Sequence, residues 1–107
     1  MPYGLTDIEL QKIINVFASN RRIVNAILYG SRAKGNFKPF SDIDITLVGK
    51  ELTRNDLIKI IQDVDNLLLP YQFDLSLWNK IKNEALIEHI ERIGISIYKR
   101  DKASKTS

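Results

Sequence analysis

Residues 28–48 read LYGSRAKGNFKPFSDIDITLV and combine a Gly-Ser pair, two basic residues and two aspartates in one short window. In an alternating strand, Asp42 and Asp44 would project from one face about 6.5–7 Å apart. Two such carboxylates repel each other unless a cation lies between them. Mg²⁺ suits the pair, because it prefers oxygen ligands and keeps positions open for phosphate oxygens. The window therefore predicts either a charged surface loop or a site that holds a polyanion against a metal ion.

Three better-known phosphate or metal motifs are excluded for this window. The residues after Gly35 are Asn36 and Phe37, where a P-loop requires Lys and Ser or Thr. A calcium loop that began at Asp42 would need a glycine where Leu47 stands. The glycine spacing of a dinucleotide-binding fingerprint is absent as well.

A third aspartate stands in a similar setting later in the chain. Asp74 lies between Phe73 and Leu75, and it would complete a three-carboxylate cluster if its strand were a neighbour of the first acidic strand. Carboxylates around one or two divalent ions serve in-line displacement at phosphorus. Gly30 and Ser31, which end a predicted strand and open a helical turn, offer N–H groups and a hydroxyl to phosphate oxygens.

Other polar residues near this site have less specific interpretations. Arg32 and Lys34 can add cationic contacts to a nucleotide as charge moves to the leaving group. Ser41 is equally consistent with a turn residue and with a phosphate contact. His89, the only histidine, is expected to be an ordinary surface residue. Trp78 is expected to pack, although it shares a predicted strand face with the third aspartate and could line a nucleotide site.

Apolar spacing predicts the elements that position these residues. Capping boxes that begin at Thr6 and Thr53 predict two amphipathic helices, the second of which ends before Pro70. Alternating helices and strands favour an α/β or α+β fold with helices packed over a sheet. The predicted strands cover 23–29, 42–48, 71–78 and 95–98, and a last helix runs from a cap at Asn79 to Gly94.

Length and composition predict a single soluble domain. The chain has 107 residues, of which 44% are hydrophobic and 27% charged, and none is cysteine. No apolar run reaches the roughly 20 residues of a membrane helix, and the N-terminus does not resemble a secretory signal. We therefore expect a cytoplasmic protein without membrane association, in keeping with the lack of cysteine.

The positive charge of the chain is concentrated at its C-terminus. The formal charge is +3, and residues 99–107 carry all of it, so that the remainder is formally neutral. We expect one folded domain over residues 1–98, which holds all the motifs above, and a basic, disordered tail over 99–107. A neutral body gives little support for direct nucleic-acid binding.

The combined pattern resembles the DNA polymerase beta-type nucleotidyltransferase superfamily. Its signature is G-S, a short spacer and D-x-D, with a third carboxylate on a later strand. Here it reads Gly30-Ser31-Arg32-Ala33-Lys34-Gly35, then Asp42-Ile43-Asp44, then Asp74. The first part is similar to the G-S-R-A-[RK]-G form of the minimal nucleotidyltransferases, single-domain proteins often encoded beside a HEPN-domain protein. The resemblance implies a small mixed β-sheet with helices packed on it.

The resemblance also implies an activity and roles for individual residues. Asp42, Asp44 and Asp74 would be catalytic and would bind Mg²⁺, usually two ions, with Mn²⁺ as the alternative metal. Asp74 would also accept the proton of the attacking hydroxyl. The nucleotide-binding residues would be Gly30, Ser31, Arg32, Lys34 and Ser41.

The implied reaction is transfer of AMP from ATP to a hydroxyl acceptor. Some minimal nucleotidyltransferases act as antitoxins of the MntA type and modify a tyrosine of the partner HEPN toxin. Because the chain is little more than the catalytic core, a partner or second subunit must supply the acceptor surface, which predicts a homo- or hetero-oligomer. Two alternatives remain: a non-catalytic antitoxin that acts by occlusion, and a small-molecule nucleotidyltransferase.

Overall fold

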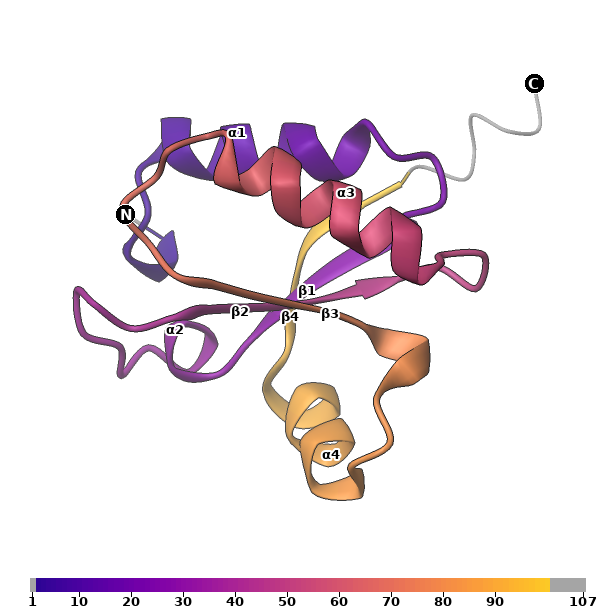
Figure 1. The fold of residues 1–107 in the computed structure, drawn as a ribbon. Coiled ribbons are helices and arrows are strands. Elements are labelled where there is room, and N and C mark those ends of the chain that lie inside the picture. The colour runs from indigo at the N-terminus through magenta and orange to yellow at the C-terminus, as the bar shows by residue number, and fades with distance from the viewer. Residues whose placement is uncertain (1, 101–107) are drawn as a thin grey trace.

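A four-stranded mixed sheet separates two layers of helices in the computed structural model, which describes residues 2–100 (Figure 1). This confirms the predicted fold class. None of the helices in that part of the chain is long and apolar enough to cross a membrane. The elements in chain order are η1 (Pro2–Gly4), α1 (Asp7–Ala18), β1 (Asn25–Tyr29), α2 (Ser31–Lys34), β2 (Ile43–Val48), α3 (Arg54–Asp65), β3 (Phe73–Leu77), η2 (Trp78–Lys80), α4 (Glu84–Ile93) and β4 (Ile95–Lys99).

The strand order β3-β2-β1-β4 makes β3 an edge strand beside the acidic strand β2. β1 runs antiparallel to both β2 and β4, whereas β2 and β3 are parallel and are joined by α3. Helices α1 and α3 cover one face of the sheet and α4 lies on the other (Figure 1). The core lies under α1 and α3, where Ile43, Ile45 and Leu47 of β2 meet apolar residues of both helices. The opposite face of β2 is therefore available for polar residues.

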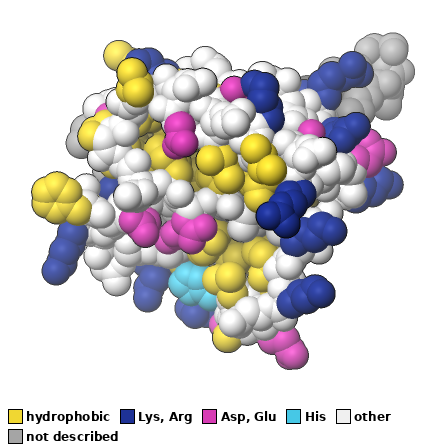
Figure 2. Space-filling view, in the orientation of Figure 1, with side chains coloured by type: hydrophobic (Ala, Val, Ile, Leu, Met, Phe, Trp, Pro, Cys, Tyr) yellow, Lys and Arg dark blue, Asp and Glu magenta, His cyan; other side chains and the backbone are white. Residues whose placement is uncertain are grey.

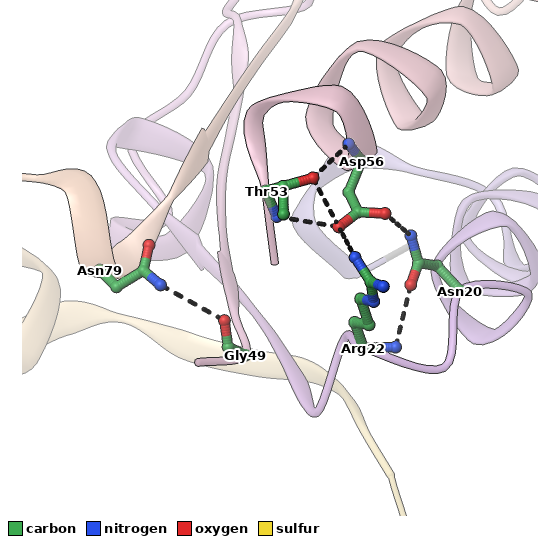
Figure 3. A network of polar contacts seen from close by, with 6 residues as sticks. All are labelled: Asn20, Arg22, Gly49, Thr53, Asp56 and Asn79. Atoms are coloured by element: carbon green, nitrogen blue, oxygen red, sulfur yellow. Dashed lines mark hydrogen bonds and ion pairs between the residues drawn. The ribbon is translucent and has the colours of Figure 1, made fainter. Parts of the chain in front are cut away.

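The region after β3 differs from its prediction. Trp78 does not continue the strand, because it opens the short helix η2. Asn79 is not the cap of the last helix: its side-chain amide donates to the carbonyl of Gly49 at 3.5 Å (Figure 3). Asn83 caps α4 instead, since its side-chain oxygen accepts a hydrogen bond from the N–H of Leu86 at 3.1 Å.

The folded unit extends beyond the predicted boundary at residue 98. Lys99 is the last residue of β4, and the backbone N–H of Arg100 donates to the carbonyl of Val24 at 3.0 Å. The Arg100 guanidinium also donates to the carbonyls of Ile23 and Asn20, at 3.1 and 3.0 Å. Both basic residues thus belong to the domain, and the remainder of the predicted tail, 101–107, lies outside the described residues.

A polar network fastens the start of α3 to the loop between α1 and β1 (Figure 3). The Asp56 carboxylate accepts from the backbone N–H of Thr53 at 2.8 Å, and the Thr53 hydroxyl accepts from the N–H of Asp56 at 3.2 Å. Arg22 forms an ion pair with Asp56 at 3.1 Å, and the amide of Asn20 donates to the same carboxylate at 3.4 Å. The N–H of Thr53, followed by its hydroxyl and Arg22, lowers the pKa of Asp56 below its ordinary value of 3.8.

This network predicts a pH-dependent contribution to stability. Because the pKa of Asp56 is lower in the folded than in the unfolded chain, the stabilisation is present above the ordinary pKa and is lost as the pH falls through the folded one. We expect Asp56→Asn to lower the free energy of unfolding by about 1 kcal/mol at neutral pH. Urea denaturation as a function of pH should show the difference from wild type shrink as the pH falls below the ordinary pKa of 3.8. Asp63→Asn, at a more exposed ion pair, is the control, and an Asp56→Asn deficit that does not change with pH would contradict this account.

Candidate active site

A row of three polar side chains crosses the sheet on the face opposite α1 and α3. Tyr29 of β1 is paired with Asp44 of β2, which is paired in turn with Asp74 of β3. Residues paired across neighbouring strands project from the same face, with the strands about 4.8 Å apart. Asp42 lies two residues before Asp44 and is exposed. Figure 2 shows acidic side chains, in magenta, gathered beside the single histidine, in cyan. The structure thus places Asp44 and Asp74 side by side on one face of the sheet, with Asp42 two residues before Asp44.

The turn after β1 presses directly on the middle carboxylate of this row. Gly30 has φ 78° and ψ −158°, a conformation that essentially only glycine adopts. A Cβ atom at Gly30 would overlap the carboxylate of Asp44. Glycine is therefore required twice, once for the backbone angle and once for the close approach of the turn to Asp44. The Gly-Ser pair and the D-x-D pair form one site.

The protonation of the row follows from burial and from its own negative charges. Burial raises the pKa of Asp44, and the neighbouring charges of Asp74 and Asp42 raise it further. Burial also raises the pKa of Tyr29, with further contributions from Asp74 and Asp44. A cation placed among these groups would oppose both effects.

The donors suit a hard divalent cation in their chemistry. All three aspartates offer carboxylate oxygens, which are the ligands that Mg²⁺ prefers. Asp44 and Asp74 are paired in register. Together with Asp42 they concentrate negative charge at this place. Within residues 2–100, however, no three acidic, histidine or cysteine side chains are already close enough together to hold a metal ion. The predicted convergence is thus found as a shared face and not as a ready-made metal cluster.

His89 contacts this site, which the sequence did not predict. Its Nε2 atom accepts a hydrogen bond from the backbone N–H of Gly30 at 3.3 Å. Its ring packs edge-on against Tyr29 with 6.2 Å between ring centroids, and it is half-buried. The histidine therefore connects α4 to the Gly-Ser turn. The sequence offered one signal, which is that His89 is next to Ile90 in the apolar stripe of the last helix. Ile90 is buried in the structure.

Arg32 is buried, in contrast to the predicted phosphate contact. Only 2% of the residue is exposed, and its guanidinium donates to the carbonyl of Ser41 at 2.8 Å and to that of Tyr3 at 2.8 Å. The rings of Phe37 and Tyr71 lie on it, each with its centroid 5.2 Å from Cζ. In this structure the Arg32 side chain therefore fastens the chain around the site and is directed to protein groups.

The remaining predicted nucleotide ligands lie around the turn. Ser31 is the first residue of α2 and is partly exposed, whereas Lys34 ends α2 and is exposed. The Ser41 hydroxyl accepts from the backbone N–H of Lys38 at 2.8 Å, so that Ser41 acts as a turn residue here. Of the two basic residues in the motif, Lys34 is the one that solvent can reach.

Comparison with known proteins identifies the family. The model of the family described as Polymerase beta, Nucleotidyltransferase matches residues 11–103. The chain belongs to this nucleotidyltransferase family. It is 27% identical over 92 residues to MJ0141 of Methanocaldococcus jannaschii, which is named as a candidate protein adenylyltransferase, and the match covers 83% of this chain and 92% of that protein.

Solved structures share the fold of this nucleotidyltransferase. A toxin–antitoxin structure with AMP-PNP superposes with a TM-score of 0.70 at 20% identity, over 91% of this chain and 78% of the other. A structure of the tri-AMPylated HEPN toxin of Shewanella oneidensis in complex with its MNT antitoxin gives a TM-score of 0.67 at 16% identity, over 95% and 79%. These likenesses show that the predicted polymerase-beta-type core is correct.

The double requirement at Gly30 predicts different effects at two glycines of the nucleotidyltransferase motif. Gly35 also has a positive φ, of 88°, but nothing lies within 4 Å of a Cβ there. We expect Gly35→Ala to cost about 1 kcal/mol of unfolding free energy from backbone strain alone. Gly30→Ala should cost about 3 kcal/mol, because strain is joined by displacement of Asp44. Equal losses in denaturant titrations of the two variants would contradict the close approach of Gly30 to Asp44.

The burial of Arg32 predicts that lysine cannot replace it. Lysine lacks the planar fork, and its single ammonium nitrogen cannot replace the separate guanidinium nitrogens that donate to the carbonyls of Tyr3 and Ser41. We expect Arg32→Lys to lower the free energy of unfolding by about 3 kcal/mol. Arg21→Lys, at an exposed position, should stay within about 0.5 kcal/mol of wild type. If Arg32→Lys were as stable as Arg21→Lys but bound ATP more weakly, Arg32 would be a phosphate ligand after all.

Proposed function

We propose that this nucleotidyltransferase transfers AMP from ATP to the hydroxyl of a protein acceptor in a Mg²⁺-dependent reaction. The observation that supports this most strongly is the joint site formed by the Gly30 turn and Asp44, with Asp74 beside it in register. A turn with N–H groups next to a row of carboxylates provides for both parts of a metal-bound triphosphate. Formation of the sheet does not explain two aspartates side by side on neighbouring strands, because aspartate is a poor strand former.

Each part of the site has a proposed role in binding the nucleotide. The N–H groups and hydroxyl at Gly30 and Ser31 would receive the β- and γ-phosphates, with Lys34 as the accessible cation. The N–H of Gly30 is bonded to His89, so a phosphate that used it would have to displace the imidazole. Asp42, Asp44 and Asp74 would hold the divalent ions, which when bound would stabilise negative charge on the phosphate oxygens.

The reaction is a displacement at the α-phosphorus. The acceptor oxygen forms a bond to that phosphorus, the bond to the bridging α,β-oxygen breaks, and pyrophosphate leaves with the bonding electrons. The acceptor proton passes to a carboxylate, for which Asp74 is suited because it is exposed on the edge strand. Asp44 is half-buried between the Gly30 turn and Asp74, so its role is to bind and not to exchange protons with the acceptor.

The acceptor that we propose is a tyrosine of a HEPN-domain partner, which would make the chain an antitoxin. The fold neighbours include a complex of an AMPylated HEPN toxin with its MNT antitoxin. The relative MJ0141 is named for protein adenylylation. The described domain has little surface beyond its nucleotidyltransferase core, so the acceptor must bring much of its own recognition surface.

Transfer of label from α-labelled ATP to a purified HEPN-domain protein, the proposed partner, tests the proposal. We expect Asp44→Asn to reduce labelling about 100-fold or more, and chelation of divalent ions to abolish it. Asp63→Asn, at a surface ion pair on α3, should label at the wild-type rate.

Two outcomes would contradict transfer as the function. Equal labelling by wild type and Asp44→Asn would remove the carboxylate row from the reaction. If the double variant Asp42→Asn/Asp44→Asn protected cells from the partner as well as wild type, occlusion would be the mechanism and not chemistry.

A further inference from the structure

An apolar groove runs along the free edge of the sheet beside the proposed active site. It lies between α3 and β3, has a volume of about 660 Å³, and takes its apolar lining from Leu57, Ile58, Ile61, Leu75, Leu77 and Ile81. Ile58 and Ile61 are 47% and 38% exposed, which is unusual for isoleucine side chains that lie next to one another. In Figure 2 a yellow apolar patch, bordered by dark blue basic side chains, lies over this part of the molecule.

The backbone beside the groove has hydrogen-bonding groups to offer. β3 has only β2 as a neighbour, and the carbonyl of Gln72 accepts from the N–H of Ile43 at 2.8 Å. In a parallel pair, alternate residues direct their N–H and C=O groups toward the partner strand. Phe73, Leu75 and Leu77 therefore direct theirs outward, away from β2. An extended chain that added to β3 would satisfy these groups while its apolar side chains entered the groove.

The charges around the groove indicate what such a chain must carry. Arg54 and Lys80 line the groove, and neither forms an ion pair with any residue in the part of the chain that the structure describes. Both cations lie toward the end of β3, because Arg54 begins α3 and Asn79, next to Lys80, donates to Gly49 in the loop before α3. A second copy of this chain would fit poorly, because a two-fold interface sets the same patch against itself and the groove lining holds no acidic residue to pair with these cations. An occupant with acidic residues at one end of an apolar stretch is complementary.

The groove lies on the α3 face of β3 and the carboxylate row on the opposite face, so a segment added to β3 would direct alternate side chains to each. The Gly30 turn closes on Asp44 from the β1 side, and Asp74 stands on the other side of Asp44, on β3 itself. If phosphates occupy the turn, the attacking hydroxyl enters from the β3 side. A protein segment held along β3 would bring its neighbouring side chains to that point.

We propose that the protein carrying the acceptor hydroxyl docks by adding an extended, apolar segment with acidic residues at one end to β3, with alternate side chains in the groove. The role of this segment in presenting the acceptor rests on the proposed function, whereas the docking itself requires no nucleotide. About five residues of the segment would pair with β3, which is five residues long.

Peptide binding followed by NMR tests the docking directly. The probe is a synthetic peptide of alternating Val and Thr, titrated into the ¹⁵N-labelled full chain. It carries Glu at both ends so that it can bind in either direction. We expect resonance changes and slower amide exchange at Phe73, Leu75 and Leu77, because these N–H groups become hydrogen-bonded. Ile58→Asp should weaken binding about tenfold or more, since it removes apolar contact. Ile8→Asp is the matched control, because Ile8 is 70% exposed on α1 and lies outside the groove.

Charge reversal tests whether the two cations beside the groove select the charge of the bound segment. The double variant Arg54→Glu/Lys80→Glu should lose affinity for the Glu-flanked peptide and gain affinity for a peptide with Lys at both ends. Absence of resonance changes along β3, or equal binding by Ile58→Asp and Ile8→Asp, would overturn the proposal. Self-association that Ile58→Asp abolishes in sedimentation would assign the groove to a second copy and would also overturn it.

The same samples separate this inference from the proposed function. ATP with Mg²⁺ is added in a parallel titration, and changes at Gly30 and Ser31 report on the nucleotide site alone. Peptide binding without nucleotide binding would support the docking surface and contradict the proposed transferase function. Nucleotide binding without peptide binding would support the nucleotide site and contradict the docking surface.

Discussion

The structure around the site depends on one buried cation. The guanidinium of Arg32 donates to the backbone carbonyls of Tyr3 and Ser41, which belong to η1 and to the loop before β2. Two aromatic rings enclose it, so that its charge meets carbonyl dipoles and π faces and no carboxylate. Because Ser41 directly precedes Asp42, this interaction determines where the acidic strand begins. The residue that resembles a phosphate ligand in sequence is instead the one that holds the site together.

The site itself combines features that folding alone would disfavour. Asp44 is half-buried, has a second carboxylate beside it on β3, and is approached so closely by Gly30 that no side chain fits there. Burial of the carboxylate and the charge beside it both cost stability unless a cation compensates them. Their coincidence at one place is the reason to regard the row as functional and not as ordinary surface charge. His89 adds a contact from α4 that keeps the turn in position while no phosphate is bound.

Sequence patterns over a few neighbouring residues were sufficient to predict several elements of the fold. The capping boxes at Thr6 and Thr53 and the alternation from Asp42 onward predicted α1, α3 and β2, because they depend on residues within a few positions of each other. The placement of Asp74 beside Asp44 followed only from the family resemblance. The burial of Arg32 and the contact of His89 with Gly30 could not be predicted, since they join residues 29 and 59 positions away in the chain. Asn79 was mistaken for a cap because Asn83, four residues later, offers the same chemistry.

The order of the strands explains how so small a domain could serve the two substrates that we propose. Because β2 is internal, its acidic residues are reached from two sides, by the Gly30 turn on β1 and by β3. On the β1 side the turn is held by the bond from Gly30 to His89 and by its close approach to Asp44, which suits the proposed nucleotide. The β3 side ends at an unpaired edge with an apolar groove, which suits a protein that must be recognised by its own sequence. With β3 at the edge of the sheet, the proposed nucleotide and acceptor would approach from opposite sides of Asp44, and the carboxylate row would lie between them.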